Sequence, residues 1–172
     1  MLDMIIRGGH VVTPSGVGVW DVAVSGEKIV AVAEPGALTD DVGRVVDASG
    51  KIVIPGGIEP HAHIAAPVAL MAPPDQVSRA ALFGGTTTLT DFAVQEPGMD
   101  IPGALAERAS RWQGNSYSDY SHHCMLLGPT PTNVLGQIKE AVQDGFPTIK
   151  IFTTDVRPVF KMSEQERRLV GM

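Results

Sequence analysis

From residue 52 onward, apolar strand-like runs alternate with amphipathic helix-like runs four times, and this alternation is the feature that most limits the possible folds. The helix-like runs begin at Pro, Asp, Thr or Ser, and the first and third of them stop at Gly. We expect strands that start at 52 and span 86–94, 120–127 and 148–153, with helices that begin near 73, 100, 132 and 163. Strands joined by helices in this way form a parallel sheet with right-handed crossovers.

Four such units amount to half of an eightfold barrel. The expected fold class is therefore α/β, with residues 52–172 forming the N-terminal part of a (β/α)8 TIM barrel. An open half barrel exposes two strand edges, and the helix that Ser163 and Glu166 would open as a capping box is still running at Met172. We therefore expect the sequence to be an N-terminal piece of a longer chain. The alternative is a small flavodoxin-like open sheet.

The first fifty residues have a different pattern, with short segments rich in Val and Ile that Gly, Pro and Ser separate. These segments span 4–7, 10–13, 19–25, 28–33 and 44–47. The sequence Ser25-Gly26-Glu27 is typical of a tight hairpin. We expect a small β-sandwich segment over residues 1–51, placed before the barrel segment 52–172.

Composition limits the function. The chain has 172 residues, of which 44% are hydrophobic and 19% charged, as in globular proteins. The net charge is −6 and there is no basic run, so we expect no nucleic-acid partner. No apolar run approaches the ~20 residues of a membrane helix. The single cysteine, Cys124, lies in an apolar stretch, and the chain starts without a secretory signal, so we expect a buried thiol and a cytoplasmic protein.

Two histidines follow the first strand-like run of the barrel segment. His61 and His63 are two residues apart, so in an extended chain both rings project from one face. Neutral imidazole is a common ligand of zinc, and barrel enzymes place their ligands after strands. The pair is thus a candidate metal site, although an isolated H-x-H motif is a weak signal by itself.

Three blocks of the sequence together resemble a known family. They are PGGIEPHAHI at 55–64, FGGTTTLTDFAVQ at 83–95 and TIKIF at 148–152. In this order they resemble the cyclic amidohydrolases, most closely the hydantoinase and dihydropyrimidinase branch. The resemblance implies an eightfold barrel with a β-sandwich made by both chain ends, two zinc ions, a tetramer, and hydrolysis of a cyclic amide substrate. It also implies that His61 and His63 bind one zinc ion and that a carbamylated Lys150 bridges both.

Lys150 is also unusual on physical grounds. It lies between Ile149 and Ile151 in a strand that we expect to be covered on both faces, where a charged ammonium is costly. Burial lowers the pKa of a lysine, and the neutral amine can take up carbon dioxide to give a carbamate with two oxygen ligands. The alternative is a lysine whose stem packs on the sheet while its head reaches the rim.

The chemistry that the resemblance implies uses a hydroxide held between the two zinc ions, which attacks the amide carbonyl and opens the ring. The acid/base aspartate and two further histidine ligands of the family would lie beyond Met172. We therefore expect the enzyme to be the longer parent protein, a hydrolase of non-peptide C–N bonds, and the 172-residue chain alone to be inactive. The alternatives are a non-catalytic scaffold relative and a dihydroorotase-like or allantoinase-like enzyme.

The sequence departs from the family at two positions. Glu59 stands where the family usually has an aspartate beside the histidines. Asp155 stands five residues after Lys150, where the family has a tyrosine whose hydroxyl helps hold the substrate. Asp155 is the candidate substrate-binding residue at this position. Because an ionised carboxylate cannot donate that hydrogen bond, the identity of the ring substrate stays undecided.

Three other polar residues in the expected strands are candidates for structural roles. His122 and His123 are adjacent, so in a strand they face opposite ways and cannot share a metal ion. We expect His123 to support the site or to lie in the core. Asp91 could face the metal ions, but hydrogen bonding to neighbouring backbone is the favoured role.

Overall fold

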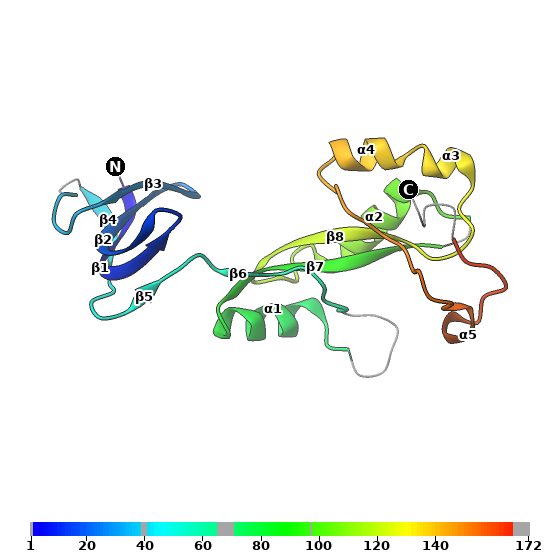
Figure 1. Ribbon diagram of the computed structural model, residues 1–172, viewed down its shortest axis with the longest axis horizontal. Coiled ribbons are helices and arrows are strands. Elements are labelled where there is room, and N and C mark those ends of the chain that lie inside the picture. Colours follow the sequence, from blue (N-terminus) through cyan, green and yellow to red (C-terminus); the bar gives the residue numbers. More distant parts are fainter. Residues whose placement is uncertain (1, 39–40, 65–70, 97, 167–172) are drawn as a thin grey trace. The chain divides into compact units, whose positions relative to one another are not determined.

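The computed structural model describes residues 2–38, 41–64, 71–96 and 98–166. The chain folds into two compact units, residues 1–55 and residues 56–172. Strands β1 to β5 belong to the first unit and the elements from β6 onward to the second (Figure 1). Within the described ranges, no helix has the length and apolar character that crossing a membrane requires.

The first unit is built on one mixed sheet. Its strands are β1 (Leu2–Thr13), β2 (Gly16–Ser25), β3 (Lys28–Ala33), β4 (Val42–Asp47) and β5 (Ile52–Val53). The order is β3-β2-β1-β4, and β5 also pairs with β1. The β1–β2 and β2–β3 pairs are antiparallel, whereas β4 and β5 run parallel to β1.

Two details of this sheet bear on the sequence predictions. The hairpin at Gly26 is confirmed, because β2 and β3 pair up to Ser25 and Lys28, and Gly26 has a φ of 59°, which suits glycine. The segments expected at 4–7 and 10–13 are one strand, whose register with β2 shifts between Ile6 and Gly9. The glycines inside this strand made it look like two strands in the sequence.

The strand expected to lead directly into the histidines is divided between the two units. Ile52 and Val53 form β5 and pair with His10 and Val11 of β1 in the first sheet. The first strand of the second sheet is β6 (Gly57–Glu59). Pro55 lies between β5 and β6, and because proline has no N–H group it interrupts a strand ladder.

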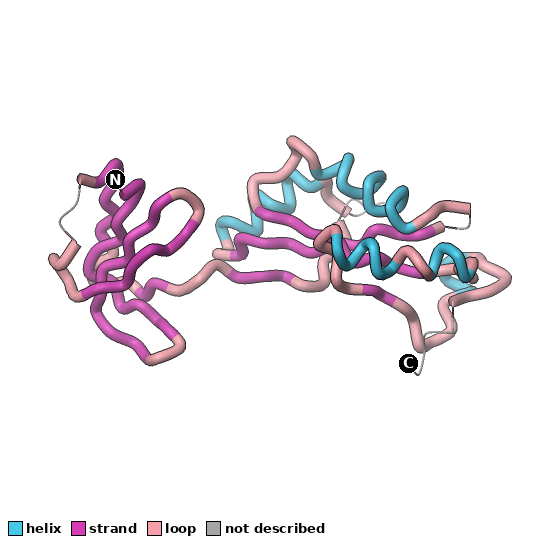
Figure 2. Tube along the Cα trace, turned by 90° about the horizontal axis from the view of Figure 1, so that it is seen from above, coloured by secondary structure: helices cyan, strands magenta, loops and turns pink. Residues whose placement is uncertain are grey.

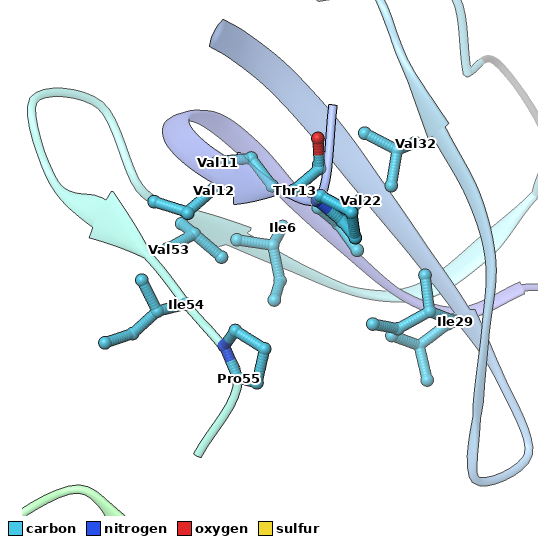
Figure 3. A pocket seen from close by; sticks show the side chains of 12 residues that line it. Ile6, Val11, Val12, Thr13, Val22, Ile29, Val32, Val53, Ile54 and Pro55 are labelled. Carbon is cyan, nitrogen blue, oxygen red and sulfur yellow. The ribbon is translucent and has the colours of Figure 1, made fainter. Parts of the chain in front are cut away.

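An apolar pocket of about 420 Å³ lies on the first unit (Figure 3). Branched aliphatic side chains from β1, β2, β3 and β5 point into it, among them Ile6, Val22, Ile29 and Val53. Several aliphatic side chains of this unit remain exposed, including Ile29 at 67% and Ile52 at 73%.

The second unit alternates strands with helices (Figures 1 and 2). In chain order its elements are β6, α1 (Pro74–Phe83), β7 (Thr86–Gln95), α2 (Ile101–Trp112), β8 (Asp119–Leu126), α3 (Thr132–Leu135), α4 (Ile138–Gln143), β9 (Ile149–Lys150) and α5 (Arg157–Phe160). The strands form one parallel sheet in the order β6-β7-β8-β9. This is the half barrel that the alternation predicts.

The strands alternate between a helix-covered face and an inner face. Leu89 of β7 packs with Val77 and Ala81 of α1 and with Trp112 of α2. Further along, a second cluster joins β7 and β8 to α2, α3 and α4 through Ala93, Ile101, Leu105, Cys124, Leu126, Val134 and Ala141. Cys124 is fully buried, as predicted. The side chains between these positions, such as Phe92 and His123, face the inside of the half barrel.

The C-terminal part of the second unit differs from the prediction. The third helix is two short helices, because Gly136 ends α3 and Gln137 precedes α4. Glycine inside a helix is unfavourable, so the break occurs there. Strand β9 is two residues long, shorter than the expected 148–153.

The expected capping box at Ser163 is wrong within the described residues. These positions are not helical, and Glu166 instead accepts a hydrogen bond from the backbone N–H of Thr130 at 2.9 Å. The remainder of that expected helix, residues 167–172, lies outside the described residues. The structure instead shows helix α5 just before this region. The residue after it, Lys161, caps the helix in the left-handed conformation with a φ of 54°.

Candidate metal centre

The two histidines lie just after β6, in a segment without regular strand structure. Two hydrogen bonds hold this segment. The backbone N–H of His61 donates to Glu59 Oε1 at 2.9 Å, and the backbone N–H of Ala62 donates to the Thr90 carbonyl of β7 at 3.0 Å. The rings of His61 and His63 lie 5.2 Å apart between centroids, and both residues are exposed. Glu59 therefore binds the histidine backbone rather than a ring nitrogen.

The structure brings Lys150 to the same place from the other edge of the sheet. Lys150 is the last residue of β9, and its Nζ lies 3.3 Å from Nε2 of His61. A hydrogen bond between these two nitrogen atoms requires one of them to accept through a lone pair. Lys150 is half-buried, whereas the sequence predicted full burial.

Phe92 of β7 lies at the centre of this group, and the sequence reasoning missed it. Its ring stacks on the ring of His63 at 4.5 Å and meets the edge of His61 at 4.8 Å. The Nζ of Lys150 lies 4.6 Å from the centre of the same ring. Phe92 reaches this group through the register of β7 with β8, in which it stands opposite His123.

The electrostatics suit a metal ligand. Partial burial of the ring, followed by the nearby His61 and Lys150, lowers the pKa of His63, which favours the neutral imidazole with its lone pair. Within the described ranges, no group of three or more His, Cys, Asp and Glu side chains is placed so that it could hold a metal ion. The donor set present is two imidazoles and one lysine amine. Zinc takes four ligands, so this set fits part of a zinc site if Lys150 supplies carbamate oxygens.

His123 supports the site instead of extending it. Its two ring nitrogens each lie 2.6 Å from an oxygen atom, Nδ1 from Thr148 Oγ1 and Nε2 from the Pro60 carbonyl. With both nitrogens engaged, the ring ties β8 to the segment that carries His61. That His123 is not a metal ligand stays a prediction.

His122 faces the helices on the opposite side of β8. It is 1% exposed, and neither ring nitrogen has a hydrogen-bond partner among the described residues. Burial lowers its pKa to about 4, so the ring is neutral at pH 7. The two adjacent histidines therefore lie on different faces, as strand geometry predicts.

Asp91 is buried on the helix side of β7, where its carboxylate accepts hydrogen bonds from several groups. The donors are the backbone N–H groups of Ile64 (3.3 Å) and Phe92 (2.8 Å), the guanidinium of Arg108 (Nε at 2.8 Å) and the indole of Trp112 (3.1 Å). The expected bonding of Asp91 to neighbouring backbone is confirmed.

The arginine partner was missed. Arg108 has a sequence signal, because it stands at helix spacing between Ala104 and Trp112, two positions of α2 that face the core. A charged residue in such a stripe indicates a buried partner of opposite charge.

Asp155 lies in the loop between β9 and α5. Its carboxylate pairs with the guanidinium of Arg157 at 2.9 and 2.8 Å and accepts the backbone N–H of Arg157 at 3.1 Å. This pair raises the pKa of Arg157. A role for Asp155 in substrate binding stays a prediction.

Comparison with known proteins agrees with this architecture. Residues 44–127 match the family model described as the amidohydrolase family. The D-hydantoinase of Rhizobium radiobacter is 33% identical over 154 residues, which make up 88% of this chain and 33% of that protein. The dihydropyrimidinase of Rattus norvegicus is 33% identical over 157 residues, or 87% of this chain and 30% of that protein. The chain thus spans about one third of the length of these relatives.

Solved structures give the same result. The dihydropyrimidinase from Brevibacillus agri superposes with a TM-score of 0.79 at 33% identity, over 90% of this chain and 33% of that one. A D-hydantoinase crystal structure gives a TM-score of 0.82 at 26% identity, over 97% of this chain and 35% of that one. A parallel half barrel that presents a histidine pair, together with these matches, makes the chain a member of the amidohydrolase family. Its homologues there are the D-hydantoinases and dihydropyrimidinases, of which it matches the N-terminal portion.

Proposed function

We propose that this chain supplies the first zinc ligands of a cyclic amidohydrolase that opens hydantoin-type or dihydropyrimidine-type rings. The observation that carries the proposal is the meeting of His61, His63 and Lys150 at one place, with 3.3 Å between Lys150 Nζ and His61 Nε2. A lysine beside two imidazoles has no evident structural purpose. The ring chemistry is further supported by the names of the relatives, D-hydantoinase and dihydropyrimidinase.

The residues of the chain have distinct roles in this proposal. The rings of His61 and His63 would each offer a nitrogen lone pair, and Phe92 packs against both rings and limits their rotation. The Lys150 amine would attack carbon dioxide, form an N–C bond and release one proton, which gives an anionic ligand with two oxygens. Zinc held by these groups would activate water and polarise the amide carbonyl.

In this proposal the activity belongs to a longer polypeptide. That polypeptide contains this segment and also a counterpart of the part of its relatives that this segment does not match. The test is ring opening of hydantoin and dihydrouracil by that longer polypeptide and by the 172-residue chain, both expressed with zinc and bicarbonate. We expect turnover by the longer polypeptide, loss of turnover in its Lys150→Ala variant, and none by the 172-residue chain. A longer polypeptide that binds zinc and opens no cyclic amide would contradict the proposal.

One observation favours a second candidate, a scaffold relative without catalysis. The position where the family has a substrate-holding tyrosine carries Asp155, whose carboxylate pairs with Arg157. Neither group reproduces a phenolic hydroxyl. Absence of bound zinc in the longer polypeptide would favour this scaffold over a hydrolase with a different ring substrate.

A further inference from the structure

The regular β6 ladder ends at Glu59, so side chains hold the histidine segment together with the backbone bond from Ala62 to Thr90. Ile64, the residue directly after His63, is 2% exposed. Its N–H donates to Asp91 Oδ1 at 3.3 Å, and its carbonyl accepts from Nη2 of Arg108. Both polar groups of this one buried peptide position are therefore satisfied by a pair of buried, oppositely charged side chains.

Burying the Asp91–Arg108 ion pair in the core is energetically unfavourable compared with burying apolar side chains. Asp91 is 1% exposed and Arg108 is 6% exposed. Removing two charges from water costs free energy, and apolar side chains of similar volume often stabilise a core as well or better. What apolar side chains cannot do is hydrogen bond to the N–H and the carbonyl of Ile64. The two charged side chains therefore hold the backbone at Ile64.

The same carboxylate also reaches the other side of the centre. Asp91 Oδ1 accepts the backbone N–H of Phe92 at 2.8 Å as well as that of Ile64. The ring of Phe92 stacks on His63 with an interplanar angle of 18°. Asp91 Oδ1 therefore holds the backbone of Ile64, which follows His63, and the backbone of Phe92, whose ring packs on His63.

We infer that Asp91 and Arg108 are positioning residues for the histidine pair, which they orient from the helix side of the sheet without touching a metal ion or the substrate. The carboxylate of Asp91 accepts hydrogen bonds from four residues, which use its acceptor capacity. The donors are Ile64, Phe92, Arg108 and Trp112. The inferred role of the Asp91–Arg108 pair in orienting zinc ligands rests on the proposed zinc site, whereas its hydrogen bonds to Ile64 do not.

The decisive variant is the double substitution Asp91→Leu with Arg108→Met, because it removes both charges and leaves neither one buried alone. The matched control is Leu105→Ala, which opens a cavity in α2 one turn before Arg108 and keeps the contacts to Ile64. Arg108→Lys is a third variant. It keeps the positive charge, but the single ammonium cannot reproduce the planar fork that reaches Asp91 and Ile64 together.

Two measurements on the 172-residue chain separate positioning from stability. The first needs no metal and uses amide hydrogen exchange at Ile64 with the NMR shifts of the imidazoles, and the exposed His10 serves as the internal reference. The second is the dissociation constant for Zn²⁺. For the double variant we expect a cooperative unfolding transition, loss of exchange protection at Ile64 and shifted signals for His61 and His63. We also expect about 10- to 100-fold weaker zinc binding.

We expect Arg108→Lys to move both readouts in the same direction and Leu105→Ala to lower stability without moving either. Unchanged protection and imidazole signals in the double variant would overturn the inference, as would equal changes in Leu105→Ala. Absence of zinc binding in the longer polypeptide would contradict the proposed function, whereas the metal-free measurement still decides whether the Asp91–Arg108 pair positions the histidines. If the unsubstituted 172-residue chain binds zinc and the double variant binds it equally well, the pair has no role in the site.

Discussion

At the scale of single residues, His122 links the fold to pH. Its pKa is about 4 in the folded chain because it is buried, and about 6.5 in an unfolded chain. Above pH 6.5 the ring is neutral in both states and contributes nothing. As the pH falls from 6.5 towards 4, the unfolded chain binds a proton that the folded chain does not, so the free energy of unfolding falls.

Between pH 7 and pH 5 this contribution amounts to a loss of about 2 kcal/mol. Urea unfolding at the two pH values measures it, with His122→Leu as the comparison because leucine does not titrate. We expect the pH-dependent loss to be smaller in His122→Leu by about that amount. Equal losses in the two proteins would contradict the assignment of this contribution to His122.

Cys124 gives a second prediction at this scale. The thiol is fully buried, and burial raises its pKa to about 11, so the reactive thiolate is scarce at pH 8. We expect no reaction with a thiol-specific disulfide reagent at pH 8 in native buffer and rapid reaction in urea, followed by absorbance. Cys124→Ser is the blank. Rapid labelling of the native protein would show that β8 is not packed as described.

At the scale of elements, helix α2 depends on its first turn. The side chain of Asp100 accepts the backbone N–H of Gly103 at 2.7 Å and so satisfies one of the free donors at the helix start. We expect Asp100→Ala to lower the free energy of unfolding by about 1 kcal/mol, measured by urea titration. Asp100→Asn keeps an acceptor and should lose much less. Equal losses in both variants would show that the cap does not act through this hydrogen bond.

The elements of the second unit were largely predictable because their signals are local. The alternating pattern of β7, the cap at Asp100 and the glycine after α1 each depend on neighbouring residues. The assignment of Ile52 to the first sheet depends on tertiary pairing with β1, so it could not be predicted from neighbouring residues. Glu166 was misread as a capping residue because its partner, Thr130, is 36 residues away.

The site was predictable to a similar extent. A short motif indicates His61 and His63, and an apolar strand makes Lys150 conspicuous. Phe92 and Arg108 belong to the same group of side chains only through the register of β7 with its neighbours and the packing of α2. Sequence spacing alone does not specify which inward side chains of different strands come into contact.

At the scale of the whole molecule, three side chains from β9 and the segment after β6 form the proposed metal-binding group. All three contact the ring of Phe92, and the Asp91–Arg108 pair holds the backbone of Ile64, next to His63. The chain spans about one third of the length of its hydantoinase and dihydropyrimidinase relatives, so its proposed chemistry is that of a larger polypeptide.

Zinc content per chain, by elemental analysis after expression with zinc and bicarbonate, tests most directly whether these three side chains act as one metal centre. The measurement compares the longer polypeptide with its Lys150→Ala variant, and with Lys139→Ala as a control lysine exposed on α4. We predict stoichiometric zinc in the unsubstituted longer polypeptide and in Lys139→Ala, and loss of zinc in Lys150→Ala. No zinc in the unsubstituted longer polypeptide, or full zinc content in Lys150→Ala, would contradict the assignment of His61, His63 and Lys150 as one metal centre.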